Sequence, residues 1–142
     1  MFKKASLILV TLTTLYTQTV TANDFDGAWH LRVMDGMEVR KARAILDLDM
    51  DKMKLSGFDA CNRIGGTLIK NSDSNMTIPM LRSTKMGCRG KIQNWVSKRL
   101  HAILKEGFNI KEENKYGVHG ITLKSPHHEL FLREWKEINQ TR

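Results

Sequence analysis

The two cysteines, Cys61 and Cys88, are the residues of this chain whose type is best suited to covalent chemistry. Each lies in a stretch rich in small and turn-forming residues, 55–66 and 83–88. A thiol pair can form a structural disulfide or carry out thiol–disulfide exchange, and exchange is typical of the short CxxC spacing. The spacing here is far longer, which favours a structural disulfide. A free or redox-active pair is the alternative.

Two further groups could do chemistry. Asp47 and Asp49 resemble a catalytic carboxylate pair, but they alternate with apolar residues, which predicts the solvent side of a strand. His127 and His128 precede a glutamate, yet adjacent side chains on a strand point to opposite faces and do not readily share an ion. We therefore predict no catalytic residue, no metal site and no cofactor.

The first 22 residues predict a secretory signal peptide. Lys3 and Lys4 precede an apolar stretch that is too short to span a bilayer, and small residues lead up to a cleavage site after Ala22. No cysteine follows the apolar stretch at this site, so the sequence does not predict a lipoprotein. The expected location is the periplasm or the exterior, where disulfides persist. In the chain-entropy estimate, a disulfide that closes the loop from Cys61 to Cys88 stabilises the folded state by about 3.6 kcal/mol.

Residues 23–142 have the size of one domain and contain no linker or repeat. The whole chain has 23 basic and 15 acidic residues, a formal net charge of +8. Such an excess favours anionic partners. Export argues against nucleic acid as that partner.

Period-two alternation predicts several strands and a hairpin. Leu46, Leu48 and Met50 should share one face, and residues 57–66 should form a glycine bend or bulge rather than regular strand. Residues 37–43 have no predicted element, and the polar run 112–115 is expected to be a turn. The other predicted strands are 28–34, 67–70, 76–81, 108–111, 118–123 and 130–135.

One helix is predicted after Cys88, because apolar residues from Ile92 to Leu104 form a single stripe that ends before Gly107. Residues 82–105 contain seven basic residues and no acidic one. These residues are either the solvated back of a core-facing helix or a contact for an anionic membrane surface. They are Arg82, Lys85, Arg89, Lys91, Lys98, Arg99 and Lys105.

The two cysteine stretches resemble the signatures of the META domain family, which includes the HslJ-like heat-shock proteins. The first runs from Ser56 to Gly66, with Ala60 where the family usually has glycine, and the second is Ser-Thr-Lys-Met-Gly-Cys, ending at Cys88. Ala60 makes an unusual backbone angle less expected at that position. The residues that match the motifs are Gly57, Asn62, Arg63, Gly65, Thr84 and Met86.

The resemblance implies an α+β fold in which a mostly antiparallel sheet, curled into a half-barrel, packs against one amphipathic helix. It also implies a likeness to the lipid-binding pilot proteins of secretion systems. No catalytic residue is transferred, and Asn62 and Arg63 are expected to hydrogen-bond the bend. The predicted function is an exported, non-enzymatic envelope protein in stress response or envelope maintenance, with an envelope protein or lipid as partner. The alternative is a module that holds a lipid or hydrophobic peptide between sheet and helix, with a link to secretion.

Overall fold

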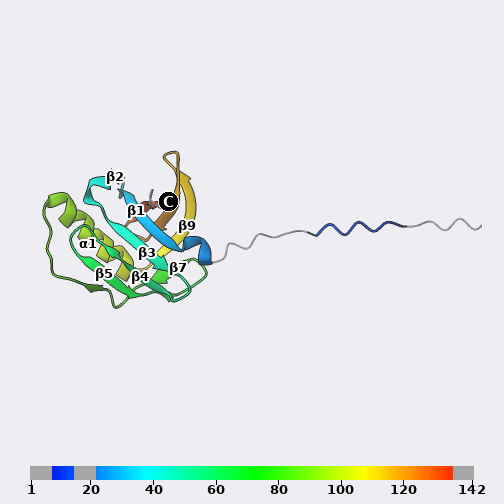
Figure 1. Cartoon of the computed structure of the whole chain (residues 1–142), viewed down its shortest axis with the longest axis horizontal. Coiled ribbons are helices and arrows are strands. Elements are labelled where there is room, and N and C mark those ends of the chain that lie inside the picture. Colours follow the sequence, from blue (N-terminus) through cyan, green and yellow to red (C-terminus); the bar gives the residue numbers. More distant parts are fainter. Residues whose placement is uncertain (1–7, 15–21, 136–142) are drawn as a thin grey trace, which may run out of the picture.

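A computed structural model describes residues 8–14 and 22–135 (Figure 1). The predicted signal peptide, 1–22, falls largely outside the described residues, and so does the end of the predicted domain, 136–142. The elements in chain order are η1 (Ala22–Phe25), β1 (Gly27–Met34), β2 (Met37–Glu38), η2 (Arg40–Ala42), β3 (Ile45–Asp49), β4 (Lys54–Phe58), β5 (Arg63–Thr67), β6 (Ile69–Lys70), β7 (Asn75–Thr77), β8 (Arg82–Ser83), α1 (Lys91–Glu106), β9 (Phe108–Lys115), β10 (Val118–Lys124) and β11 (Glu129–Glu134).

The strands form one antiparallel sheet that curls into a half-barrel around α1, the one α-helix in the described part of the chain (Figure 1). Its order is β6-β7-β9-β10-β11-β1-β3-β4-β5-β8, with β2 paired to β1. Many of the neighbours are consecutive in sequence, including β3–β4, β4–β5, β9–β10 and β10–β11. The long-range pairing of β1 with β11 joins the first strand of the sheet to the last and completes the curl. The predicted fold class is therefore confirmed.

The apolar stripe of α1 faces the concave side of the sheet. Val96, Leu100, Ile103 and Leu104 are at most 1% exposed, as are Leu31 and Leu46 on the facing strands. Gly107 ends the helix with a positive φ of 104°, and its N–H donates to the carbonyl of Ile103 at 3.1 Å. The predicted helix is confirmed, and its apolar face fills the interior of the half-barrel.

The predicted alternation of β3 is also confirmed, because Leu46, Leu48 and Met50 are all buried. In β1 the alternation changes along the strand. Leu31 pairs with Leu132 and Val33 pairs with Phe131, so Arg32 is an extra residue opposite β11. This β-bulge buries Met34 rather than Val33.

Several predicted boundaries are wrong. Residues 57–66 are not a glycine bend: β4 and β5 pair in regular register, and the chain turns only at residues 59–62. The polar run 112–115 is not a turn, because β9 continues through it and pairs with β10. The turn comes instead at Tyr116 and Gly117, whose φ angles are 55° and 73°. Residues 37–43 contain β2 and η2.

Ala60 also departs from expectation. Its φ is 85°, the left-handed region that the alanine was expected to avoid. The turn at residues 59–62 therefore imposes the backbone angle for which a glycine is better suited.

Candidate functional site

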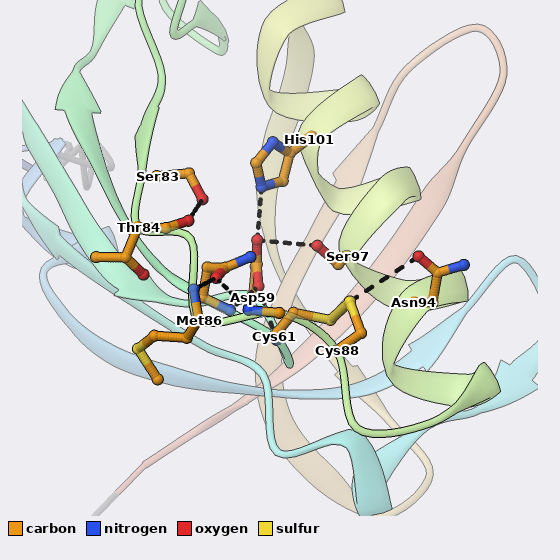
Figure 2. Close-up of a disulfide and its surroundings, with 11 residues drawn as sticks. Asp59, Cys61, Ser83, Thr84, Met86, Cys88, Asn94, Ser97 and His101 are labelled. Atoms are coloured by element: carbon orange, nitrogen blue, oxygen red, sulfur yellow. Dashed lines mark hydrogen bonds and ion pairs between the residues drawn. A yellow bond between two sulfur atoms is a disulfide. The ribbon is translucent and has the colours of Figure 1, made fainter.

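The disulfide between Cys61 and Cys88 joins the turn at residues 59–62 to the segment that leads into α1 (Figure 2). The two Cα atoms are 4.4 Å apart, and Cys61 is only 3% exposed. The predicted structural disulfide is present. It connects two parts of the chain that are 27 residues apart.

Hydrogen bonds join the same two segments beside the disulfide. The side-chain Oδ1 of Asn62 accepts from the backbone N–H of Met86 at 2.6 Å and of Gly87 at 3.1 Å. The N–H of Arg63 donates to Thr84 Oγ1 at 3.0 Å, and the N–H of Thr84 donates to the Arg63 carbonyl at 3.0 Å. The side chain of Asn62 therefore binds the backbone of the second motif, while its main-chain carbonyl accepts from the N–H of Asp59 within the turn. Arg63 contributes through its backbone.

The remaining motif residues have separate roles. A Cβ on Gly57 would lie 2.1 Å from the carbonyl oxygen of Ile45, so β3 and β4 can approach this closely only with glycine there. Gly65 has no such contact, since the nearest atom would be the Leu55 carbonyl oxygen at 3.6 Å. The Met86 side chain is 64% exposed.

Sequence reasoning missed the central residue of this site, Asp59, which is 0% exposed. Its Oδ1 accepts from the N–H groups of Cys61 at 2.8 Å and Asn62 at 2.6 Å. Its Oδ2 accepts from the Ser97 hydroxyl at 2.9 Å and lies 2.5 Å from His101 Nε2. Figure 2 shows Asp59 pointing from the turn toward α1, where Ser97 and His101 lie one helical turn apart. The short Asp-to-Cys spacing is the Asx-turn pattern that could have identified Asp59.

We call this set of interlocked residues the clasp: Asp59, Cys61, Asn62, Thr84, Cys88, Ser97 and His101. Burial raises the pKa of the Asp59 carboxyl, but hydrogen bonds from Asn62, Cys61, His101 and Ser97 outweigh it and hold that pKa below its ordinary value. Ser97 and His101 both bond to the same oxygen of Asp59. A nucleophile activated by a base needs the serine to face the histidine instead. The arrangement is suited to holding α1 against the turn.

The other candidate groups have local partners. Asp49 Oδ1 accepts from the N–H of Lys52 at 3.0 Å, which closes the β3–β4 turn, and Asp47 is exposed. His127 pairs with Glu106, whereas His128 Nδ1 lies 2.8 Å from Asp35 Oδ2. Within residues 8–14 and 22–135, no group of three or more His, Cys, Asp and Glu side chains could hold a metal ion.

The predicted basic residues between 82 and 105 are exposed, with one exception. Arg99 is half-buried: its Cζ lies 3.9 Å from the centre of the Trp95 ring, and its Nε lies 3.5 Å from Asp35 Oδ2. We call the six exposed ones the basic segment, which consists of Arg82, Lys85, Arg89, Lys91, Lys98 and Lys105.

A hollow of about 640 Å³ lies beside the clasp. Lys41, Arg43 and Arg89 line it, and Phe58 and Met86 supply apolar surface. No acidic residue lines it. Sequence reasoning missed Lys41 and Arg43 because they precede the basic segment by about forty positions.

Comparison with known proteins agrees with this architecture. The chain is similar to a solved NMR structure with 24% sequence identity and a TM-score of 0.65, over 81% of this chain and 95% of that one. It is also similar to the NMR structure of a protein from Burkholderia xenovorans, with 19% identity and a TM-score of 0.58, over 79% of this chain and 83% of that one. These likenesses show the fold. No curated protein sequence matches significantly.

The model of the META domain family matches residues 19–135. That span includes every residue of the clasp and the whole sheet from β1 to β11. The chain belongs to the META domain family.

Proposed function

We propose that this chain is an exported, non-enzymatic META-domain protein of the cell envelope that associates with an anionic membrane surface through the basic segment. The single observation that supports this best is the exposure of that segment. Two large apolar side chains, Met80 just before the segment and Met86 within it, are 82% and 64% exposed. Basic side chains interleaved with exposed apolar ones are typical of proteins that lie on a membrane interface.

The clasp supports this role by holding the segment in place. Asn62 binds the backbone at Met86 and Gly87, and the disulfide fixes Cys88 immediately before Arg89. The basic side chains are thus presented from a backbone anchored to the sheet. Less conformational entropy is lost on binding when a surface is preorganised in this way.

Export is part of the proposal and accords with the disulfide, because disulfides form and persist mainly outside the cytoplasm. Among the described residues, no helix is long and apolar enough to cross a membrane. Fractionation and N-terminal sequencing of the protein from its own cells test export. A mature chain that begins at Asn23 supports it, and a cytoplasmic chain that retains residues 1–22 contradicts it.

Vesicle sedimentation tests the membrane contact. The purified protein should bind vesicles of phosphatidylglycerol and phosphatidylcholine, and binding should weaken steeply with salt. Changing Lys85, Arg89 and Lys98 together to glutamine should weaken binding by about a hundredfold, at about 1 kcal/mol per basic residue. The charge-matched control changes Lys52, Lys54 and Lys111 to glutamine and should bind nearly as well as the wild type. Equal losses in both variants, or binding insensitive to salt, would contradict the proposal.

The absence of enzymatic activity is supported by the way the clasp uses its side chains. Ser97 and His101 are both bonded to Asp59 Oδ2, which leaves neither arranged as a nucleophile–base pair. A role in stress response or envelope maintenance rests on family resemblance alone. Survival of a deletion strain under heat and detergent stress tests it, and growth equal to that of the parent strain would count against it.

The second candidate function is a module that binds a lipid or hydrophobic peptide, with a link to secretion. The space between α1 and the sheet is already filled, because Val96, Leu100 and Ile103 are at most 1% exposed. A hollow of about 800 Å³ near β6, β7 and β9 offers room within the usual range of ligand pockets. Phe25, Met76 and Ile110 give it apolar surface. Native mass spectrometry of protein purified from its envelope tests this candidate, and the absence of any co-purified lipid or peptide contradicts it.

A further inference from the structure

Four arginines surround one histidine on the outer face of the sheet. His30 and Arg32 lie on β1, on the side opposite the buried Trp29 and Leu31. We call the four arginines the arginine cluster; they are Arg32, Arg40, Arg43 and Arg133. Arg133 on β11 is paired directly with His30, while Arg40 begins η2 and Arg43 is its C-cap. The neighbouring elements β1 and η2 and the distant β11 thus bring like charges together.

The cluster is not neutralised by its acidic neighbours. Glu38 pairs with Arg40, 3.1 Å from its Nε, and Asp47 on β3 pairs with Ala28, two positions before His30 on β1. Two carboxylates against four guanidinium groups leave a positive excess. Burial and then the charges of Arg32, Arg40, Arg133 and Arg43 lower the pKa of His30. Burial is the largest cause of this pKa shift, and the four arginine charges act in the same direction.

One donor of the cluster also lacks a partner. The Nε atom of Arg32 is buried and has no hydrogen-bond partner within the described part of the chain. Its position follows from the β-bulge, and the Arg32 carbonyl accepts from the N–H of Val39 at 2.8 Å, which holds the loop to η2 beside the strand. A buried donor without an acceptor costs free energy, so an acceptor supplied by a ligand would be favoured.

We propose that the arginine cluster binds the phosphate group of a phosphate-bearing molecule. Guanidinium groups bind phosphate in a bidentate manner and remain charged at all physiological pH values. A phosphate monoester has a charge of about −1.5 to −2 at pH 7, which matches the excess of the cluster. Its oxygens would also accept from Arg32 Nε. The hollow beside the clasp is lined by Arg43 and leaves room for the remainder of the molecule.

NMR titration with inorganic phosphate tests this site in the purified protein. The Arg32 Nε–H resonance should shift and saturate, because that donor gains an acceptor. Arg133→Gln removes an exposed member of the cluster and should weaken phosphate binding by about tenfold. Lys54→Gln, at an exposed lysine of β4 outside both the cluster and the basic segment, is the charge-matched control and should change the dissociation constant by less than about twofold. Thermal melts of both variants verify that they are folded.

Two results would overturn the proposal: no saturating shift up to about 10 mM phosphate, or equal weakening in Arg133→Gln and Lys54→Gln. Competition distinguishes the source of the phosphate group. Displacement of inorganic phosphate by vesicles of phosphatidic acid, but not of phosphatidylcholine, indicates a lipid headgroup. Displacement by glycerol 3-phosphate alone indicates a free phosphate ester. A double variant of Lys85 and Lys98 to glutamine, which leaves the lining of the hollow unchanged, should retain phosphate binding and so separates this site from the basic segment.

Discussion

The clasp and the arginine cluster are both polar, but they differ in whether their polar groups have hydrogen-bond partners. In the clasp, the buried carboxylate of Asp59 receives bonds from two backbone N–H groups, Ser97 and His101. In the cluster, positive charges face one another, and Arg32 Nε has no acceptor among the described residues. Buried polar groups that are hydrogen-bonded stabilise the fold, whereas a buried group without a partner costs free energy that an acceptor from a ligand would offset. The comparison predicts opposite effects on stability when the two regions are altered.

The largest effect should come from the disulfide. Changing Cys61 and Cys88 together to alanine should lower the free energy of unfolding by about 3.6 kcal/mol, since the unfolded chain regains the entropy of an open loop. Urea denaturation measures this loss. Reduction of the wild type with dithiothreitol is the matched comparison and should produce a similar loss. An unchanged denaturation midpoint would contradict a stabilising role for the disulfide.

Asp59→Ala should cost about 3 kcal/mol, because it removes the acceptor of several buried donors. Asp47→Asn is the control, since Asp47 is exposed on β3 and its replacement should change stability by less than about 0.5 kcal/mol. Thermal and urea unfolding of both variants measure the difference. If the two substitutions cost the same, Asp59 does not hold the clasp together.

The same carboxylate predicts a dependence of stability on pH. The folded pKa of Asp59 lies below its ordinary value of 3.8, so the folded protein binds fewer protons there than the unfolded chain. This contribution is complete above 3.8 and is lost as the pH falls from 3.8 through the folded pKa. Asp59→Asn should therefore show a shallower fall in stability between pH 5 and pH 2 than the wild type. Parallel pH profiles would contradict this assignment.

Local patterns predicted much of the fold. The alternation of Leu46, Leu48 and Met50 and the stripe of α1 were sufficient because each depends on residues close in sequence. The β-bulge at Arg32 depends on pairing with β11, about a hundred positions away, so the local alternation of residues does not predict it. The turn between β9 and β10 was predicted too early in the sequence for another reason. Glu112 and Glu113 are polar and so suggested a turn, but they lie in β9 and pair with β10.

The site was less predictable than the fold. The cysteines indicated the disulfide, and the motif resemblance identified the two segments that it joins. Asp59 was missed because its partners Ser97 and His101 are 38 and 42 positions away. The arginine cluster was missed because its members come from β1, η2 and β11, and only the tertiary fold brings them together. Sites assembled from distant elements leave no short-range spacing in the sequence.

Ala60→Gly should stabilise the clasp by about 1 kcal/mol, because a non-glycine residue at a φ of 85° is strained. The control is Ala44→Gly. Ala44 is buried and is not among the described residues with positive φ, so its replacement should destabilise by about 1 kcal/mol. Urea denaturation measures both signs. A destabilising Ala60→Gly would show that the methyl group of this residue, only 6% exposed, contributes more than the strain costs.

The smallest effect should come from the arginine cluster, and its sign is opposite to that of Asp59. Without ligand, Arg133→Gln should stabilise the protein by up to about 0.5 kcal/mol, because it relieves repulsion between like charges. Lys70→Gln is the control: Lys70 lies 3.9 Å from Asp73, so losing its charge should be neutral or slightly destabilising. The stability gained by Arg133→Gln should shrink as salt screens the repulsion. It should become a loss when phosphate is added, because only the wild type then gains the full free energy of phosphate binding. A destabilising Arg133→Gln at low salt without phosphate would mean that the cluster is internally compensated, and the contrast with the clasp would fail.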